Sequence, residues 1–242
     1  MGNWYDDIDC HENNTYQWSA SDALVFIRHP VDEIVKVFFQ PVFCVIGFSL
    51  NMSFLFVICR LKDMQTITNA YLVNLAIADL ICLISNTVIE TMQYVITPFI
   101  TDYGFLGTPG CVLKYLLHFV SFHSSMLMVT IVSLERYIAI CFPLKHRRIA
   151  GKRRTAGIIT ACWVVALIFS LPLVLNKSKT NRFCVAWPSG DETFDGFPAV
   201  IGACARLPNT PWNYRITADY VCEGGVFMCC FVGKCPGLTS LC

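Results

Sequence analysis

The chain has 242 residues, of which 55% are hydrophobic and 14% are charged, and its mean hydropathy is +0.54. Soluble domains average about 25% charged residues, so this deficit indicates that lipid forms part of the protein's surroundings. A formal net charge of +1 gives no reason to expect nucleic acid as a partner. The composition therefore favours a membrane protein over a soluble or nucleic-acid-binding domain.

The amino-terminal tail, residues 1–36, is polar and acidic. It has no basic stretch followed by an apolar run, so we predict no cleavable signal peptide. Asn13 begins an Asn-Asn-Thr sequon, which is glycosylated only where the chain faces the lumen or the cell exterior.

Two predicted membrane spans follow the tail. Residues 37–59 contain no charged residue, and about 20 apolar residues suffice to cross the hydrocarbon as a helix. The second span, residues 70–95, carries polar groups on one helical face: Asp79, Asn86, Glu90 and Gln93. Such a stripe should face a bundle interior and not lipid. A helix end that emerges into water would explain Gln93 and even Glu90, but not Asp79 near mid-membrane.

The third and fourth predicted spans cover residues 111–140 and 156–175. Glu135 and Arg136 stand near the end of the third span, where an acid–base pair indicates the boundary between membrane and water. Basic side chains fill the loop between the two spans: Lys145, Arg147, Arg148, Lys152, Arg153 and Arg154. Positive residues mark the cytoplasmic side, so this pattern places the loop inside and the amino-terminal tail outside.

The pattern weakens after the fourth span. Asn176 begins a second sequon on the predicted outer side. Residues 189–242 are rich in Gly, Pro and polar groups and contain at most a weak fifth span, near 218–233. We therefore predict an all-α membrane protein with four clear spans and a weak fifth.

No catalytic or metal-binding pattern accompanies these spans. His118 and His123 lie in one predicted helix without a nucleophile or a second base, and the cysteines form no paired CxxC units. The sequence therefore predicts neither an enzyme nor a metal site.

A set of motifs, in order along the chain, resembles those of rhodopsin-like (class A) G-protein-coupled receptors of the neuropeptide type. The motifs are Gly47-Phe-Ser-Leu-Asn51, Asn74-Leu-Ala-Ile-Ala-Asp79, Glu135-Arg-Tyr137, Trp163 with Pro172, and Cys184-Val-Ala-Trp-Pro188. They cover about residues 37–188, so the resemblance implies a partial seven-transmembrane helical bundle. The family's sixth and seventh helices have no counterpart here, and residues 189–242 match poorly.

The resemblance also implies roles for single residues. Arg136, next to Tyr137, would be held by Glu135 at rest and released to meet the G protein. Three polar residues would hold a sodium ion, as an allosteric modulator, or waters: Asn51, Asp79 and Ser125. Cys111 would form a disulfide with Cys184, and Cys204 is a rival partner that stays open.

His118 occupies the position where the family's amine receptors carry an aspartate, which argues against an amine ligand. A polar and aromatic cavity suited to a peptide would instead be lined by Glu90, Gln93, His118, Phe119 and Phe122. The alternative for Phe119 and Phe122 is packing between helices, which aromatic residues at helical spacing often serve.

Three functional hypotheses follow. The first is a peptide receptor at the plasma membrane, present here as an incomplete chain, with membrane lipid, a heterotrimeric G protein and a second receptor copy as partners. The second is a truncated, non-signalling form that pairs with a full-length receptor and retains it in the endoplasmic reticulum. The third, a transporter or channel, ranks last because no internal repeat or paired broken helices support it.

Overall fold

The computed structural model describes these parts of the chain: 10, 15–19, 23–24, 30–99, 102–144, 151–177, 180–188, 194 and 196–204. The predicted fifth span near 218–233 and the Asn13 sequon lie outside the described residues, as does the side chain of Asn176. Within the described part, four helices are long and apolar enough to cross a membrane. The predicted fold class, part of a helical membrane bundle, is confirmed.

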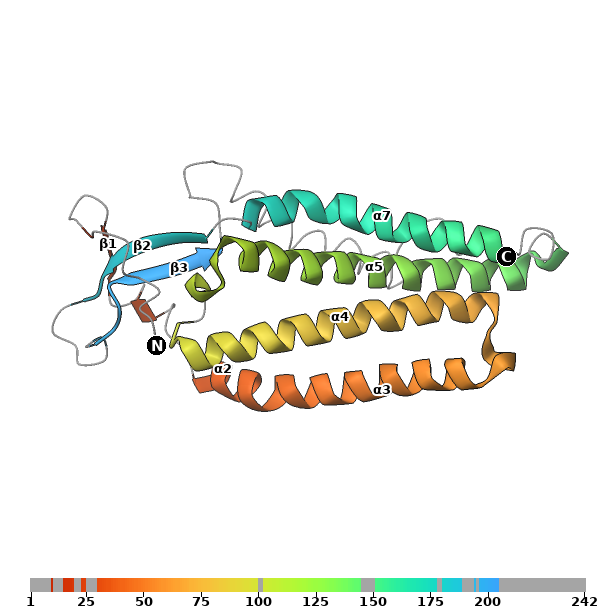
Figure 1. Ribbon diagram of the computed structural model, residues 1–242, viewed down its shortest axis with the longest axis horizontal. Coiled ribbons are helices and arrows are strands. Elements are labelled where there is room, and N and C mark those ends of the chain that lie inside the picture. The colour runs from red at the N-terminus through yellow and green to blue at the C-terminus, as the bar shows by residue number, and fades with distance from the viewer. Residues whose placement is uncertain are drawn as a thin grey trace. The chain divides into compact units, whose positions relative to one another are not determined.

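The four long helices begin and end close to the predicted spans (Figure 1). They are α3 (Gln40–Arg60), α4 (Ile67–Ile96), α5 (Gly107–Cys141) and α7 (Lys152–Lys177). A short helix, α2 (Pro30–Ile34), and a π-helical turn at Val35–Phe39 lead into α3. Ile58 is the buried residue of α3, whose other apolar side chains are partly or largely exposed, as suits a helix that faces lipid.

A small three-stranded sheet, absent from the sequence-based prediction, accompanies the helices. Its strands are β1 (Thr15–Gln17), β2 (Thr180–Ala186) and β3 (Val200–Cys204), side by side in that order (Figure 1). β1 runs parallel to β2, with Thr15 opposite Cys184. β2 and β3 are antiparallel, with Thr180 opposite Cys204.

The chain divides into two compact units, which are described separately. Unit 1 comprises residues 1–45, 84–115 and 174–207, and unit 2 comprises 46–83, 116–173 and 208–242. Each long helix contributes one end to unit 1 and the rest to unit 2. All three strands of the sheet belong to unit 1.

Aromatic rings form the core of unit 1. Phe99 is fully buried and stacks on Trp187 with ring centroids 5.1 Å apart, while Phe197 meets both rings edge-on. The indole N–H of Trp187, which is half-buried, donates to the carbonyl of Pro198 at 3.0 Å, so its polar group is paired. This core joins the segment after α4 to the sheet.

The core of unit 2 joins three helices through Tyr71 on α4, Met128 on α5 and Cys162 on α7, all buried. α3 meets α4 at Gly47, where an added Cβ would stand 2.8 Å from Leu83 Cδ1. A glycine at this position therefore allows the two helices to approach closely.

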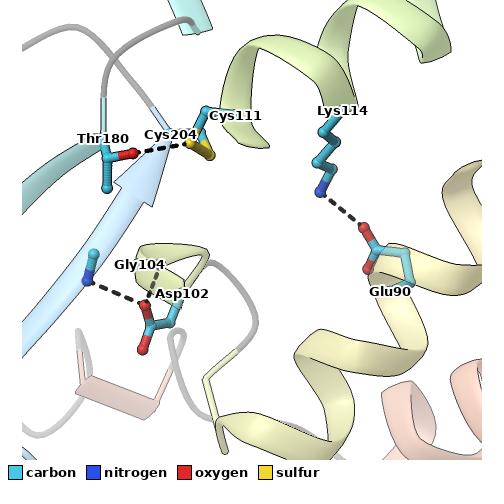
Figure 2. Close-up of a disulfide and its surroundings, with 8 residues drawn as sticks. Glu90, Asp102, Gly104, Cys111, Lys114, Thr180 and Cys204 are labelled. Carbon is cyan, nitrogen blue, oxygen red and sulfur yellow. Dashed lines mark hydrogen bonds and ion pairs between the residues drawn. A yellow bond between two sulfur atoms is a disulfide. The ribbon is translucent and has the colours of Figure 1, made fainter. Parts of the chain in front are cut away.

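The loop after α4 is held against β3 by backbone contacts around Asp102 (Figure 2). The fully buried Asp102 carboxylate accepts hydrogen bonds from the N–H groups of Gly104, at 3.0 Å, and Gly202, at 3.1 Å. Tyr103 N–H donates to Gly202 O at 2.8 Å. A Cβ on Gly202 would stand 2.4 Å from Gly104 Cα, so only glycine fits between the strand and the loop.

We expect Gly202→Ala to destabilise unit 1 by about 1–3 kcal/mol, since an inserted methyl group must push the loop away from β3. The measurement is thermal unfolding of the purified chain in detergent. Gly157→Ala is the matched control, because nothing lies within 4 Å of the Cβ that it adds. Equal stability of the two variants would contradict the close approach.

Candidate functional site

Two disulfides bind the sheet of unit 1, and one of them corrects the predicted pairing. Cys111, at the start of α5, pairs with Cys204 and not with Cys184, and their Cα atoms are 5.6 Å apart (Figure 2). Cys184 pairs with Cys10 of the amino-terminal segment. The predicted Cys111–Cys184 bond is therefore wrong, and the rival Cys204 is the partner.

Strand register explains this choice. Cys204 ends β3 opposite Thr180, and the Thr180 hydroxyl lies 3.2 Å from Cys111 Sγ, so this end of the hairpin meets α5. Cys184 lies four residues farther along β2, roughly 13 Å away at the rise of a strand. There it stands opposite Thr15 of β1, within reach of Cys10.

A charged group at one end of α4 and α5, called here the Glu90 cluster, comprises Lys36, Glu90, Gln93, Tyr103 and Lys114. Lys36 Nζ and Lys114 Nζ each lie 3.1 Å from a Glu90 carboxylate oxygen. Tyr103 donates its hydroxyl to Glu90 at 2.8 Å, and Lys36 donates to Gln93 Oε1 at 2.9 Å. Figure 2 shows Lys114 extending from α5 toward Glu90.

The Glu90 cluster is largely shielded from solvent. The exposed fraction of the side chain is 7% for Lys114, 15% for Lys36 and 22% for Glu90. Lys114 Nζ also lies 3.3 Å from the centroid of the Tyr103 ring, a cation–π contact. Among the described residues of the cluster, two ammonium groups thus face one carboxylate.

Tyr103 remains a hydrogen-bond donor to this cluster at any physiological pH. Burial raises the pKa of its hydroxyl far above the ordinary value, and the neighbouring Glu90 carboxylate raises it further. The Tyr103 hydroxyl is therefore a fixed donor, and the charge of the cluster is set by the lysines and Glu90.

The sequence analysis found Glu90 and Gln93 but missed Lys36, Tyr103 and Lys114. Lys114 had a readable signal, because a lysine inside an apolar span needs an acidic or polar partner. Gln93 is fully buried, and its amide donates to the carbonyl of Phe99. Gln93 therefore ties the cluster to the aromatic core of unit 1.

The other predicted ligand contacts, His118, Phe119 and Phe122, belong to unit 2. The His118 ring centroid lies 5.0 Å from that of Phe119 and 6.4 Å from that of Phe122. Phe119 is buried, which is compatible with the alternative that it packs between helices. The lining of one cavity by these three residues together with Glu90 and Gln93 stays a prediction.

Unit 2 brings together two of the three residues predicted to hold sodium or water. Ser125 on α5 donates its hydroxyl to Asp79 on α4 at 2.7 Å. The amide of Asn51 instead donates to Gly47 O of its own helix at 2.8 Å. The described residues contain no group of three or more His, Cys, Asp or Glu side chains arranged to hold a metal ion. Sodium binding therefore stays a prediction.

The Glu135-Arg136-Tyr137 motif departs from the arrangement that the resemblance implies. Glu135 is buried and pairs with Arg154 of α7 at 2.6 Å, whereas Arg136 is exposed. Consecutive residues point in different directions from a helix, so Glu135 faces α7 and Arg136 faces away. The expected pair between Glu135 and Arg136 is thus replaced by a pair between α5 and α7. Tyr137 lies beside Phe142, with ring centroids 6.2 Å apart.

Comparison with known proteins identifies the family. Residues 50–204 match the model of the 7 transmembrane receptor (rhodopsin family). The chain is 34% identical to neuromedin-U receptor 2 of Mus musculus, over 76% of this chain and 44% of the relative. It is 32% identical to the thyrotropin-releasing hormone receptor of Mus musculus and to the urotensin-2 receptor of Bos taurus, each over 57% of this chain and 34% of the relative.

The chain thus spans between about a third and half of the length of these relatives. The relatives are signalling receptors and not enzymes, in agreement with the sequence analysis. Four apolar helices and this match make the chain a multi-pass membrane protein. It belongs to the rhodopsin family of seven-transmembrane receptors and corresponds to part of the length of such a receptor.

Proposed function

We propose that this chain is part of a peptide receptor at the plasma membrane that passes an extracellular signal to a heterotrimeric G protein. In this proposal the amino terminus and the sheet are extracellular, and the basic loop after α5 is cytoplasmic. The names of the relatives support a peptide ligand, because they are receptors for neuromedin U, thyrotropin-releasing hormone and urotensin-2.

The observation that carries the proposal is the Glu90 cluster, which lies within unit 1 beside the sheet that Cys111 and Cys204 anchor. Lys114 follows Cys111 by one helical turn, so the disulfide fixes the part of α5 that presents the lysine. Preorganised polar groups on a rigid support are suited to orient a ligand that carries several hydrogen-bonding groups.

The charge of the cluster favours one chemical feature in the ligand. Glu90 already faces two lysines, so it is not a free counter-charge for an amine. The two lysines would instead suit a ligand carboxylate, such as a peptide carboxyl terminus or an acidic side chain. His118, in place of the aspartate of amine receptors, agrees with this preference.

The remaining roles stay proposals. Asp79 and Ser125, with Asn51, would hold a sodium ion or waters that favour the inactive state. Arg136 would contact the G protein, and its exposure leaves it accessible. The pair between Glu135 and Arg154 would restrain that end of α5 at rest.

The proposal is tested in a chimera that adds the remaining helices of a receptor to this chain. We expect a chimera of residues 1–204 with the remaining helices of mouse neuromedin-U receptor 2 to respond to a peptide from a panel of carboxylate-bearing peptides. Arg136→Gln should abolish the response at unchanged surface expression. Arg153→Gln, which removes an exposed charge from α7, is the matched control. A correctly inserted chimera that answers no peptide would count against the proposal.

The second hypothesis, a non-signalling form that pairs with a full-length receptor and retains it, remains an alternative. Its motive is that polar groups such as Asp79 and His118 would lack partners from later helices of the bundle. Unchanged surface levels of a co-expressed relative would count against retention.

A further inference from the structure

Part of the amino-terminal segment is fastened to the sheet of unit 1, and this part, Cys10 together with residues 15–18, is called here the strap. Cys10 is bonded to Cys184 of β2. The strand of the strap, β1, pairs with β2 so that Thr15 stands opposite the same Cys184. The covalent and the backbone attachment of the strap therefore meet β2 at one residue. No role proposed above uses this disulfide.

The non-covalent contacts described for the strap are small. β1 has three residues and runs parallel to β2, and short parallel pairings are among the less stable kinds. The Trp18 ring meets Trp187 edge-on, with ring centroids 5.3 Å apart, and Trp18 N–H donates to Ala186 O at a long 3.4 Å. The side chains of Tyr16 and Gln17 are exposed and bury little surface. The disulfide therefore contributes strongly to holding the strap on β2.

Solvent reaches the disulfide of the strap but not the disulfide at α5. Cys10 is exposed, although Cys184 has an exposed fraction of only 1%. Both cysteines of the other bond are buried, with exposed fractions of 0% for Cys111 and 3% for Cys204. Thiol–disulfide exchange requires a thiolate to reach one sulfur of the bond. A dissolved reductant can therefore attack the strap disulfide at Cys10, whereas the bond between β3 and α5 is protected.

The other side of the sheet is closed in a different way. Gly202 of β3 donates its N–H to the Asp102 carboxylate and accepts the N–H of Tyr103 at its carbonyl. These contacts contain no reducible bond, so loss of the strap would leave β3 in place. It would make β2 the edge strand from Cys184 to Ala186. An edge strand offers unpaired backbone N–H and C=O groups to a partner in an extended conformation.

We propose that the Cys10–Cys184 disulfide is a redox-sensitive latch, which holds the strap on β2 when oxidised and releases it when a protein dithiol reduces the bond. One thiolate of the dithiol bonds to Cys10 Sγ, and the electron pair of the broken bond leaves on Cys184 Sγ. The second thiolate of the dithiol then displaces Cys10 Sγ. The two cysteines take up the protons that the dithiol has lost, so the latch becomes two thiols and the dithiol becomes a disulfide.

The surroundings suit a latch that is closed until a reductant reaches it. In the topology proposed above the sheet faces the cell exterior, where disulfides persist. Only this placement is taken from the proposed function, and the latch itself needs neither a peptide nor a G protein. The chimera described above and the experiment below can therefore fail independently of each other.

The experiment treats the purified full chain, in detergent and without denaturant, with reduced thioredoxin as the protein dithiol. Free thiols are alkylated at successive times and located by peptide mapping. We expect alkylation of Cys10 and Cys184 about tenfold faster than that of Cys111 and Cys204, since only the first bond is accessible. Backbone hydrogen exchange in β1 should become about tenfold faster on reduction, while exchange in β3 stays slow.

Four variants separate the latch from its surroundings. Cys10→Ser/Cys184→Ser removes the bond without a reductant and should give the same rise of exchange in the strap. Cys59→Ser removes an exposed free thiol of α3 and should leave exchange in the strap unchanged. In the chain without the latch, Trp18→Ala should raise the exchange further because it removes a ring contact. Gln17→Ala, which alters an exposed side chain of the same strap, should change exchange less than about twofold.

Three outcomes would overturn the proposal. The first is reduction of the two disulfides at equal rates, and the second is earlier reduction of the bond between Cys111 and Cys204. The third is a reduced strap whose backbone exchanges as slowly as in the oxidised chain, because the disulfide would then not be what holds the strap on β2.

Discussion

Replacing Glu90 with glutamine is expected to lower the free energy of unfolding by about 2–3 kcal/mol. The change leaves Lys36 and Lys114 shielded from water without a carboxylate, and breaking a buried pair from one side costs about 3–5 kcal/mol. The expected loss is smaller because 22% of the Glu90 side chain is exposed, so the ion pairs are not fully buried. Thermal or denaturant unfolding of the chain in one detergent gives the measurement.

Two further variants make this result specific. Glu33→Gln, on α2, removes an exposed carboxylate that has no ion-pair partner among the described residues, so it should change stability by less than about 0.5 kcal/mol. Adding Lys114→Met to Glu90→Gln removes one of the two stranded cations and should recover part of the loss. A double variant less stable than Glu90→Gln would show that Lys114 stabilises the chain by some other contact.

The helices were predictable because the signal for a membrane span is local. Length and hydropathy placed all four, and the structure extends each by only a few residues. The one-sided polar stripe on α4 also led to a true contact, that of Asp79 with Ser125. Both follow from a periodicity that a single helix carries in its own sequence.

The sheet and its disulfides were not predictable in the same way. β1 has only three residues, and it pairs with a strand that begins at Thr180. No local pattern encodes a pairing over such a distance, and cysteine spacing alone does not fix connectivity. The family resemblance implied Cys184 as the disulfide partner of Cys111. The strand register instead brings Cys204 to Cys111.

The ion pairs were likewise only partly predictable from the sequence. Sequence marked Glu90 as unusual in an apolar span, but its partners come from the turn before α3, the loop before α5 and α5 itself. For the Glu135-Arg136 motif, the family resemblance implied an ion pair between two residues that the structure separates. The residues are adjacent in sequence, yet the helix directs them apart, and Arg154 reaches Glu135 instead.

Removing the Cys111–Cys204 disulfide with a Cys111→Ala/Cys204→Ala double variant is expected to destabilise the chain by about 2–4 kcal/mol. The bond closes a loop with a sequence separation of 93, and cross-links over loops of this length strongly restrict the unfolded chain. It is also the covalent link between β3 and α5, so its loss should loosen Lys114 and the Glu90 cluster.

The measurement is unfolding with and without reductant, together with non-reducing peptide mapping. Cys59→Ala removes an exposed free thiol of α3 and should leave both readouts unchanged. Cys184→Ala separates the two possible pairings. If Cys204 is the partner, the peptide linked to Cys111 persists in this variant and only Cys10 is released. Loss of the cross-link to Cys111 in Cys184→Ala would instead restore the pairing that the family resemblance implies, and with it a different attachment of the sheet to α5.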